Sequence, residues 1–113
     1  LGELPLKLPA RAPSATSQAR SSWHLYVVEV VPGAGVADRA TVFQRLWDVS
    51  IAVNVHYIPI HTQPYYRARG FQKGQFPAAE AYYAQAISIP LFPALTDAQQ
   101  DYVVGALATA LRA

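Results

Sequence analysis

Apolar and polar positions along the chain fall into short strand-like runs separated by stretches with helical spacing. Residues 23–31, WHLYVVEVV, are almost continuously apolar and rich in aromatic and β-branched side chains, which predicts a strand at the centre of a sheet or covered on both faces. The alternation in Ile51–Ile58 predicts a second strand. Ser88–Leu91 predicts a short extended piece, in which Pro90 argues against a central strand with all its ladder hydrogen bonds.

Helical spacing of apolar residues predicts three helices, over residues 38–49, 77–86 and 96–112. Asp38 is a suitable N-cap for the first, and Pro77 suits the first turn of the second. Thr96 and Gln99 form a capping box at the start of the third. The succession of strand, helix and strand over about 35 residues suggests a crossover unit, although the sequence leaves the direction of pairing open.

Prolines at every fourth position, Pro5, Pro9 and Pro13, block a helix and predict that residues 1–21 are an extended lead-in. Within and just after this lead-in, residues 14–22 are rich in Ser, Ala and Gln and resemble a linker. The length of 113 residues allows one domain. Composition and spacing alone therefore lead to a small α/β domain.

The segment Ala52–Tyr66 concentrates the candidate chemistry, because it contains two of the three histidines and three of the seven tyrosines. Pro59 and Pro64 break its strand-like alternation, and a loop up to Phe76 is predicted. A loop of this length in a compact domain is usually functional or disordered, and its aromatic content favours function.

Each chemical group in this segment has an ordinary structural interpretation beside the functional one. His56 is either a strand-end imidazole bonded to the backbone or a substrate contact at the mouth of a cleft, and both stay open. A metal shared by His56 and His61 would lack further ligands. Arg67, Arg69 and Lys73 either face a phosphate or acidic partner or form a solvated basic loop.

Composition excludes several classes of function. A net charge of +2 is too small to argue for nucleic acid, and no apolar run is long enough for a membrane span or a signal peptide. Cysteine is absent, which excludes disulfides and thiolate chemistry. The chain has only 14% charged residues and no methionine, so we expect a piece of a longer, cytoplasmic protein whose surface a partner covers.

The amino-acid sequence of three blocks resembles the C-terminal part of the DegT/DnrJ/EryC1/StrS sugar aminotransferases. The blocks are SSWHLYVVEV (21–30), VHYIPIHTQPYYRARGF (55–71) and FPAAEAYYAQAISIPLFPALTDAQQDYVV (76–104). The H-Y-x-P-x-H turn, followed by P-Y-Y and A-E-x-Y-Y, is most similar to the branch that makes UDP-4-amino-4,6-dideoxy-N-acetyl-β-L-altrosamine. His24 matches the H-L-Y of the family, and we expect a structural role for it.

The resemblance implies an α+β fold, the small C-terminal domain (22–113) of a fold-type I pyridoxal-phosphate transferase, with a mixed or antiparallel sheet of three or four strands and about three helices. It implies transfer of an amino group from glutamate to a nucleotide-linked 4-keto sugar in surface-glycan synthesis. The family's Schiff-base lysine lies in a large N-terminal domain, in an S-x-H-x-x-K stretch absent from this chain. Lys7 and Lys73 have no such context. We therefore expect no catalytic residue, bound cofactor or transaminase activity in the isolated chain.

The resemblance also implies a role for the central segment in orienting the sugar nucleotide and closing the site. The residues expected to bind substrate are His56, Tyr57, Ile58, Pro59, His61 and Tyr65. Expected partners are the nucleotide sugar, the large domain and a second subunit of a homodimer. The alternative is a stand-alone, non-catalytic binding module that uses the same domain, and a domain-swapped dimer of the fragment is a third possibility.

Overall fold

The computed structural model describes residues 1–10, 22 and 24–113. The expected linker, 14–22, therefore lies outside the described residues except for Ser22, and so does Trp23. The elements are β1 (Leu6–Lys7), β2 (Tyr26–Val30), α1 (Arg39–Asp48), η1 (Ile60–Thr62), α2 (Pro64–Arg67), α3 (Pro77–Gln85), β3 (Ala86–Ile89) and α4 (Asp97–Ala110).

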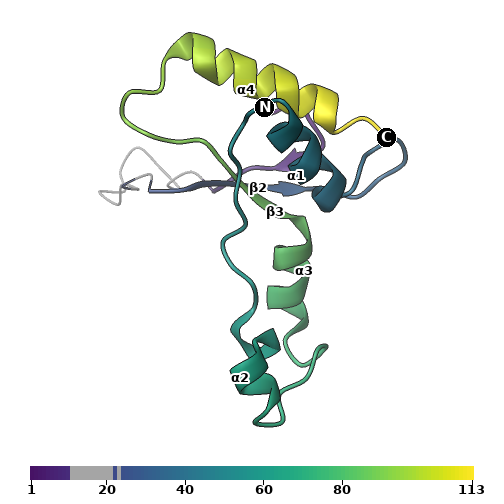
Figure 1. The fold of residues 1–113 in the computed structure, drawn as a ribbon. Coiled ribbons are helices and arrows are strands. Elements are labelled where there is room, and N and C mark those ends of the chain that lie inside the picture. The colour runs from purple at the N-terminus through teal and green to yellow at the C-terminus, as the bar shows by residue number, and fades with distance from the viewer. Residues whose placement is uncertain (11–21, 23) are drawn as a thin grey trace, which may run out of the picture.

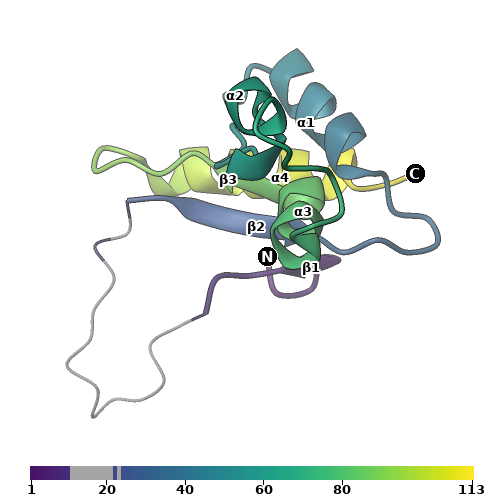
Figure 2. The ribbon, with the colours of Figure 1, turned by 90° about the horizontal axis from the view of Figure 1, so that it is seen from below.

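The three strands form one antiparallel sheet in the order β1-β2-β3 (Figures 1 and 2). Strand β2 lies at the centre, as its continuous apolar run predicts, and its Val28 pairs with Ile87 of β3. Both pairings among the described strands are antiparallel, and the suggested crossover from residues 23–31 to residues 51–58 is not formed, because 51–58 contains no strand. The expectation of a small α+β fold with an antiparallel sheet is confirmed.

Strand β1 comes from the proline-rich beginning of the chain, where the sequence predicts only an extended lead-in. Leu6 pairs with Val30, and Lys7 pairs with Glu29, whose carboxylate is 2.9 Å from the lysine ammonium. Leu1, Leu4, Leu6 and Leu8 pack against the core. The described part of the lead-in thus belongs to the packed domain.

Helices α1 and α4 lie together on one face of the sheet (Figure 1) and enclose a single apolar core. Its largest fully buried side chains are Val28, Val42, Leu46, Ile87 and Leu107. They come from two strands and two helices, so the core depends on contacts between elements that are distant in sequence.

Both helices that cover the sheet begin where their capping residues predict. The Asp38 carboxylate accepts a hydrogen bond from the Thr41 N–H at 2.8 Å. At the start of α4, the Thr96 hydroxyl accepts from the Gln99 N–H at 3.3 Å, and the Gln99 side chain accepts from the Thr96 N–H at 2.9 Å. These caps satisfy N–H groups that have no partner within the helix.

The predicted strand Ile51–Ile58 is wrong. Only Asn54 pairs with the sheet, through an isolated bridge to Ser88. The Asn54 side chain then accepts the Val55 N–H at 2.7 Å, so a local hydrogen bond replaces the next one of a ladder. The chain leaves the sheet at this point.

Residues 55–85 form an arm that projects from the body on the side away from α4 (Figure 1). The predicted loop up to Phe76 contains η1 and α2, and α3 returns the chain to β3. The apolar stripe predicted for α3 does not enter the core, because none of the helix residues is buried and Ala86 belongs to β3. The arm therefore lies outside the main apolar core, although α3 also contacts β2.

Replacing Leu46 tests the core. Leu46→Ala removes a fully buried side chain and leaves a cavity, so we expect the free energy of unfolding to fall by about 2–5 kcal/mol. Urea denaturation followed by circular dichroism measures the change. The matched control is Leu91→Ala, at a position 38% exposed, which should cost much less. Equal losses for the two variants would contradict this description of the core.

Candidate functional site

The arm joins the body at β3. The His56 Nδ1 atom lies 2.8 Å from the hydroxyl of Ser88, which is buried on β3. Asn54 and Ser88 exchange two backbone hydrogen bonds beside this contact. On the other side, Arg39 of α1 lies over the Tyr83 ring, with its guanidinium carbon 5.2 Å from the ring centre. These contacts orient the arm relative to the sheet and α1.

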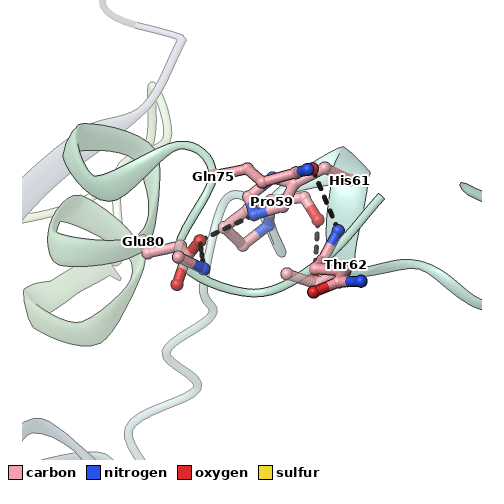
Figure 3. Close-up of polar contacts among 7 residues, drawn as sticks. Pro59, His61, Thr62, Gln75 and Glu80 are labelled. Carbon is pink, nitrogen blue, oxygen red and sulfur yellow. Dashed lines mark hydrogen bonds and ion pairs between the residues drawn. The ribbon is translucent and has the colours of Figure 1, made fainter. Parts of the chain in front are cut away.

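Within the arm, a buried histidine and a glutamate link the two chain segments. His61 is 4% exposed, and its Nε2 lies 2.8 Å from Oε1 of Glu80 on α3 (Figure 3). The same oxygen accepts the Gly74 N–H at 2.6 Å. Gly74 has a φ of 94°, a conformation that favours glycine, and it turns this N–H toward the carboxylate.

These contacts stabilise the ionised form of Glu80. The Gly74 N–H lowers the pKa of the Glu80 carboxyl most, His61 lowers it further, and desolvation opposes both. The carboxylate is therefore charged at neutral pH, and its charge is directed to the interior of the arm.

Aromatic side chains extend this interior toward the tip. The ring of His61 lies 4.8 Å from that of Phe76, and Phe76 lies 6.3 Å from Phe71. Phe71 in turn contacts Tyr66, with ring centres 6.0 Å apart. This small cluster packs η1 and α2 against the start of α3, although Phe71 and Phe76 remain 39% and 47% exposed.

The residues expected to bind substrate occupy three kinds of position. Tyr57 and Tyr65 are 70% and 59% exposed, and Ile58 is also exposed. His56 is half-buried at the root of the arm, whereas Pro59 and His61 are buried. The structure thus gives His61 a partner within the arm, and it leaves the two tyrosines exposed, with the Arg69 guanidinium carbon 3.6 Å from the centre of the Tyr65 ring.

A hollow of about 610 Å³ lies between the arm and the beginning of α1. Ile58 and Pro59 line it, but His56, Tyr57, His61 and Tyr65 do not. Its polar and charged lining comes from Asp38, Arg39, Thr62, Lys73, Glu80 and Tyr83. The sequence places Arg39 on the polar side of an ordinary helix, and no local signal indicates its position beside the arm.

The fold, a small α+β unit with a three-stranded antiparallel sheet, is shared with aminotransferases of known structure. The chain belongs to the DegT/DnrJ/EryC1/StrS aminotransferase family, whose model matches residues 1–108.

Relatives with known sequences or structures extend this assignment. The chain is 35% identical over 97 residues to the spore coat polysaccharide biosynthesis protein SpsC of Bacillus subtilis, covering 84% of this chain and 25% of the relative. A putative sugar aminotransferase of Streptococcus pneumoniae in its PLP form superposes with a TM-score of 0.82 at 30% identity, over 96% of this chain and 27% of that one. DesV of S. venezuelae, in complex with a ketimine intermediate, superposes with a TM-score of 0.79 at 28% identity. The superposition covers 99% of this chain and 28% of DesV. The chain spans about a quarter of each relative.

The described residues do not by themselves fit pyridoxal phosphate. This cofactor needs a lysine for a Schiff base and a partner for its pyridinium nitrogen. Of the two lysines, Lys7 is paired with Glu29 at the edge of the sheet, and Lys73 is exposed on the arm. Neither is enclosed as a cofactor lysine is, so no chemical step through the cofactor is derived from this chain.

Metal-binding clusters and membrane-spanning helices would each be recognisable in the described residues. In the described part of the chain, no three His, Asp or Glu side chains gather as a metal site would require. No helix among the described residues is long and apolar enough to cross a membrane.

Glu80→Gln tests the buried pair of the arm. Because the pKa of Glu80 is lowered in the folded state, its ionised form contributes stability above the ordinary pKa of glutamate, about 4.3. This contribution is lost as the pH falls through the lowered value. The stability advantage of the wild type over Glu80→Gln should therefore be present at pH 7 and shrink below about pH 4.3.

Urea midpoints measured between pH 3 and pH 7 report this difference. The matched control is Glu3→Gln, which removes an exposed carboxylate outside the arm and leaves the Gly74 and His61 contacts in place. A constant difference between the wild type and Glu80→Gln across this range would show that the pair does not stabilise the fold.

Proposed function

We propose that this chain is the C-terminal small domain of an aminotransferase that moves an amino group from glutamate to a nucleotide-linked 4-keto sugar. The observation that carries the proposal is the family match over residues 1–108, together with a fold shared over almost the whole chain with sugar aminotransferases. In this proposal, a large domain precedes the lead-in 1–21, whose β1 packs with the small domain, and residues 22–113 form the rest of the small domain. The H-Y-x-P-x-H turn favours UDP-4-amino-4,6-dideoxy-N-acetyl-β-L-altrosamine as the product.

The arm is proposed to bind and orient the sugar nucleotide. Tyr57 and Tyr65 are exposed and combine an apolar ring with a hydroxyl group, which suits the mixed apolar and polar surface of a sugar. His56 and Ile58 flank Tyr57, while Pro59 and His61 support the turn from within. Holding the acceptor in a reactive orientation lowers the entropic part of the barrier.

The remaining parts of the reaction are assigned to the rest of the parent protein. Pyridoxal phosphate, when bound there, carries the amino group between donor and acceptor. We propose that the parent is a cytoplasmic homodimer and that the isolated chain has no transaminase activity.

The product of the complete reading frame tests this proposal. The purified protein should bind pyridoxal phosphate through an S-x-H-x-x-K lysine upstream of this chain and should aminate a UDP-linked 4-keto sugar with glutamate as donor. His56→Ala and Tyr57→Phe should each lower kcat/KM for the sugar by roughly tenfold, the effect of losing one hydrogen bond to the substrate. The half-reaction with glutamate should stay unchanged, because these residues contact only the acceptor.

Matched controls are His24→Ala and Tyr102→Phe, which change the same residue types at exposed positions outside the arm. Tyr57→Phe removes a single exposed hydroxyl and leaves the fold intact, so it remains informative if His56→Ala unfolds the arm. Wild-type kcat/KM in Tyr57→Phe and a folded His56→Ala would exclude the arm residues as sugar contacts. A reading frame without a cofactor domain would instead favour a non-catalytic binding module.

A further inference from the structure

A second hollow, of about 840 Å³, opens on the face of the arm formed by α2 and the turn that follows it. Its lining consists of Thr62, Pro64, Arg67, Phe71, Gln72 and Lys73. Two of these side chains are cations, and none is a carboxylate. Among the described residues, neither cation forms an ion pair. An anion would therefore meet two uncompensated positive charges here.

The two hollows of the arm adjoin, because Thr62 and Lys73 line both. Arg39 adds a third cation at the far end. Its Nε atom is buried without a hydrogen-bond partner, and Nη2 makes one long hydrogen bond of 3.4 Å to the Tyr83 carbonyl. Arg39 as a whole is half-buried and lines the first hollow, so its positive charge acts on that hollow. We call the surface lined by Arg39, Lys73 and Arg67 the cationic groove.

The two carboxylates near the groove, Asp38 and Glu80, each accept hydrogen bonds from other groups of the protein. Glu80 accepts from Gly74 and lies against His61, inside the arm. Asp38 caps α1, and the Thr41 N–H lowers its pKa. These hydrogen bonds stabilise the two negative charges but do not cancel them, and the charge of Arg39 also acts on Asp38. The linings of the two hollows together hold three cations and two carboxylates, a surplus of one positive charge, and the hollow lined by Arg67 and Lys73 holds no carboxylate. The surplus of positive charge remains available to a ligand.

We propose that the cationic groove binds the diphosphate of a nucleotide-linked ligand. Arg67 and Lys73 provide charge-assisted hydrogen bonds to phosphate oxygens, and Arg39 is placed to receive the neighbouring part of the ligand. Phe71 gives the groove an aromatic wall beside these cations, which suits a nucleoside. The inference rests on the proposed function, because the nucleotide sugar is the ligand that it locates.

The dimensions of the groove favour a small molecule over an acidic protein. Each hollow has a volume within the range of small-molecule pockets, roughly 300–1,000 Å³. A protein partner would in addition need a contact area of about 800 Å² on this side. A nucleoside diphosphate requires no such extended contact area.

Calorimetric titration of the full-length, cofactor-loaded protein with UDP, inorganic pyrophosphate and uridine tests the inference. Arg67→Gln and Lys73→Gln should each weaken UDP binding by roughly tenfold, the typical effect of losing one charge-assisted hydrogen bond. Both positions are exposed, so neither substitution should disturb the fold. The control Arg112→Gln removes the same charge at an exposed position outside the arm and should leave the affinity unchanged. Arg39 is not substituted, because it packs on Tyr83 and its loss would change the stability of the protein as well as ligand binding.

Comparing UDP, pyrophosphate and uridine separates the contribution of the diphosphate to the affinity from that of the nucleoside. Tighter binding of UDP than of pyrophosphate, with uridine much weaker than either, supports a nucleotide diphosphate in the groove. Tighter binding of pyrophosphate, or unchanged UDP affinity in the double variant Arg67→Gln/Lys73→Gln, overturns the assignment.

Transamination, assayed in parallel, separates this inference from the proposed function. If the enzyme is active but its affinity for UDP does not change in the Arg67 and Lys73 variants, only the inference is contradicted. Cation-dependent UDP binding without any transamination contradicts the function alone.

Discussion

The pairing of β3 with β2 is the contact on which both the body and the arm depend. Along β3, successive side chains point to opposite faces of the sheet. Ile87 enters the core between the sheet and the two covering helices. The side chain of its neighbour Ser88 points to the other face and contacts His56, and the Ser88 backbone pairs with Asn54 along the free edge of β3. A single short strand thus closes the core and fixes the root of the arm, so a shift of its register by one residue would exchange the two roles.

The tip of the arm is stabilised differently from the body, because large apolar side chains such as Ile60, Phe71 and Phe76 stay exposed there. A buried imidazole and a carboxylate replace a larger hydrophobic core there. Such a pair is tolerated when its hydrogen-bonding groups are satisfied, and the Gly74 N–H and His61 satisfy one oxygen of Glu80 together. The aromatic side chains of Phe71 and Phe76 then shield this polar contact on one side. The result is a firm support for exposed residues that would otherwise lie on a long loop.

The sequence predicts those features that depend on neighbouring residues and fails where distant residues meet. Asp38 and Thr96 mark the starts of α1 and α4 correctly, because a cap involves residues only three positions apart. The sequence does not predict strand β1, because β1 pairs with residues of β2 that lie more than twenty positions further along the chain. The strand predicted at Ile51–Ile58 fails because Asn54 offers the backbone a local alternative that periodicity does not reveal. Likewise, His61 carries no sign in the sequence that its partner is Glu80, nineteen residues away.

The separation between cofactor chemistry and substrate recognition explains why the arm has the composition that it has. Neither lysine of the chain suits a Schiff base, so on the proposed function the reactive lysine lies on another part of the parent protein. The arm then has to present binding groups across a domain boundary, and any looseness in it would misplace the sugar relative to the reacting atoms. Residues that contact the ligand must be exposed, as Tyr57 and Tyr65 are, while residues that fix the arm must be buried, as His61 is. The concentration of histidines and tyrosines in one segment therefore combines two requirements, and only the fold shows which residue serves which.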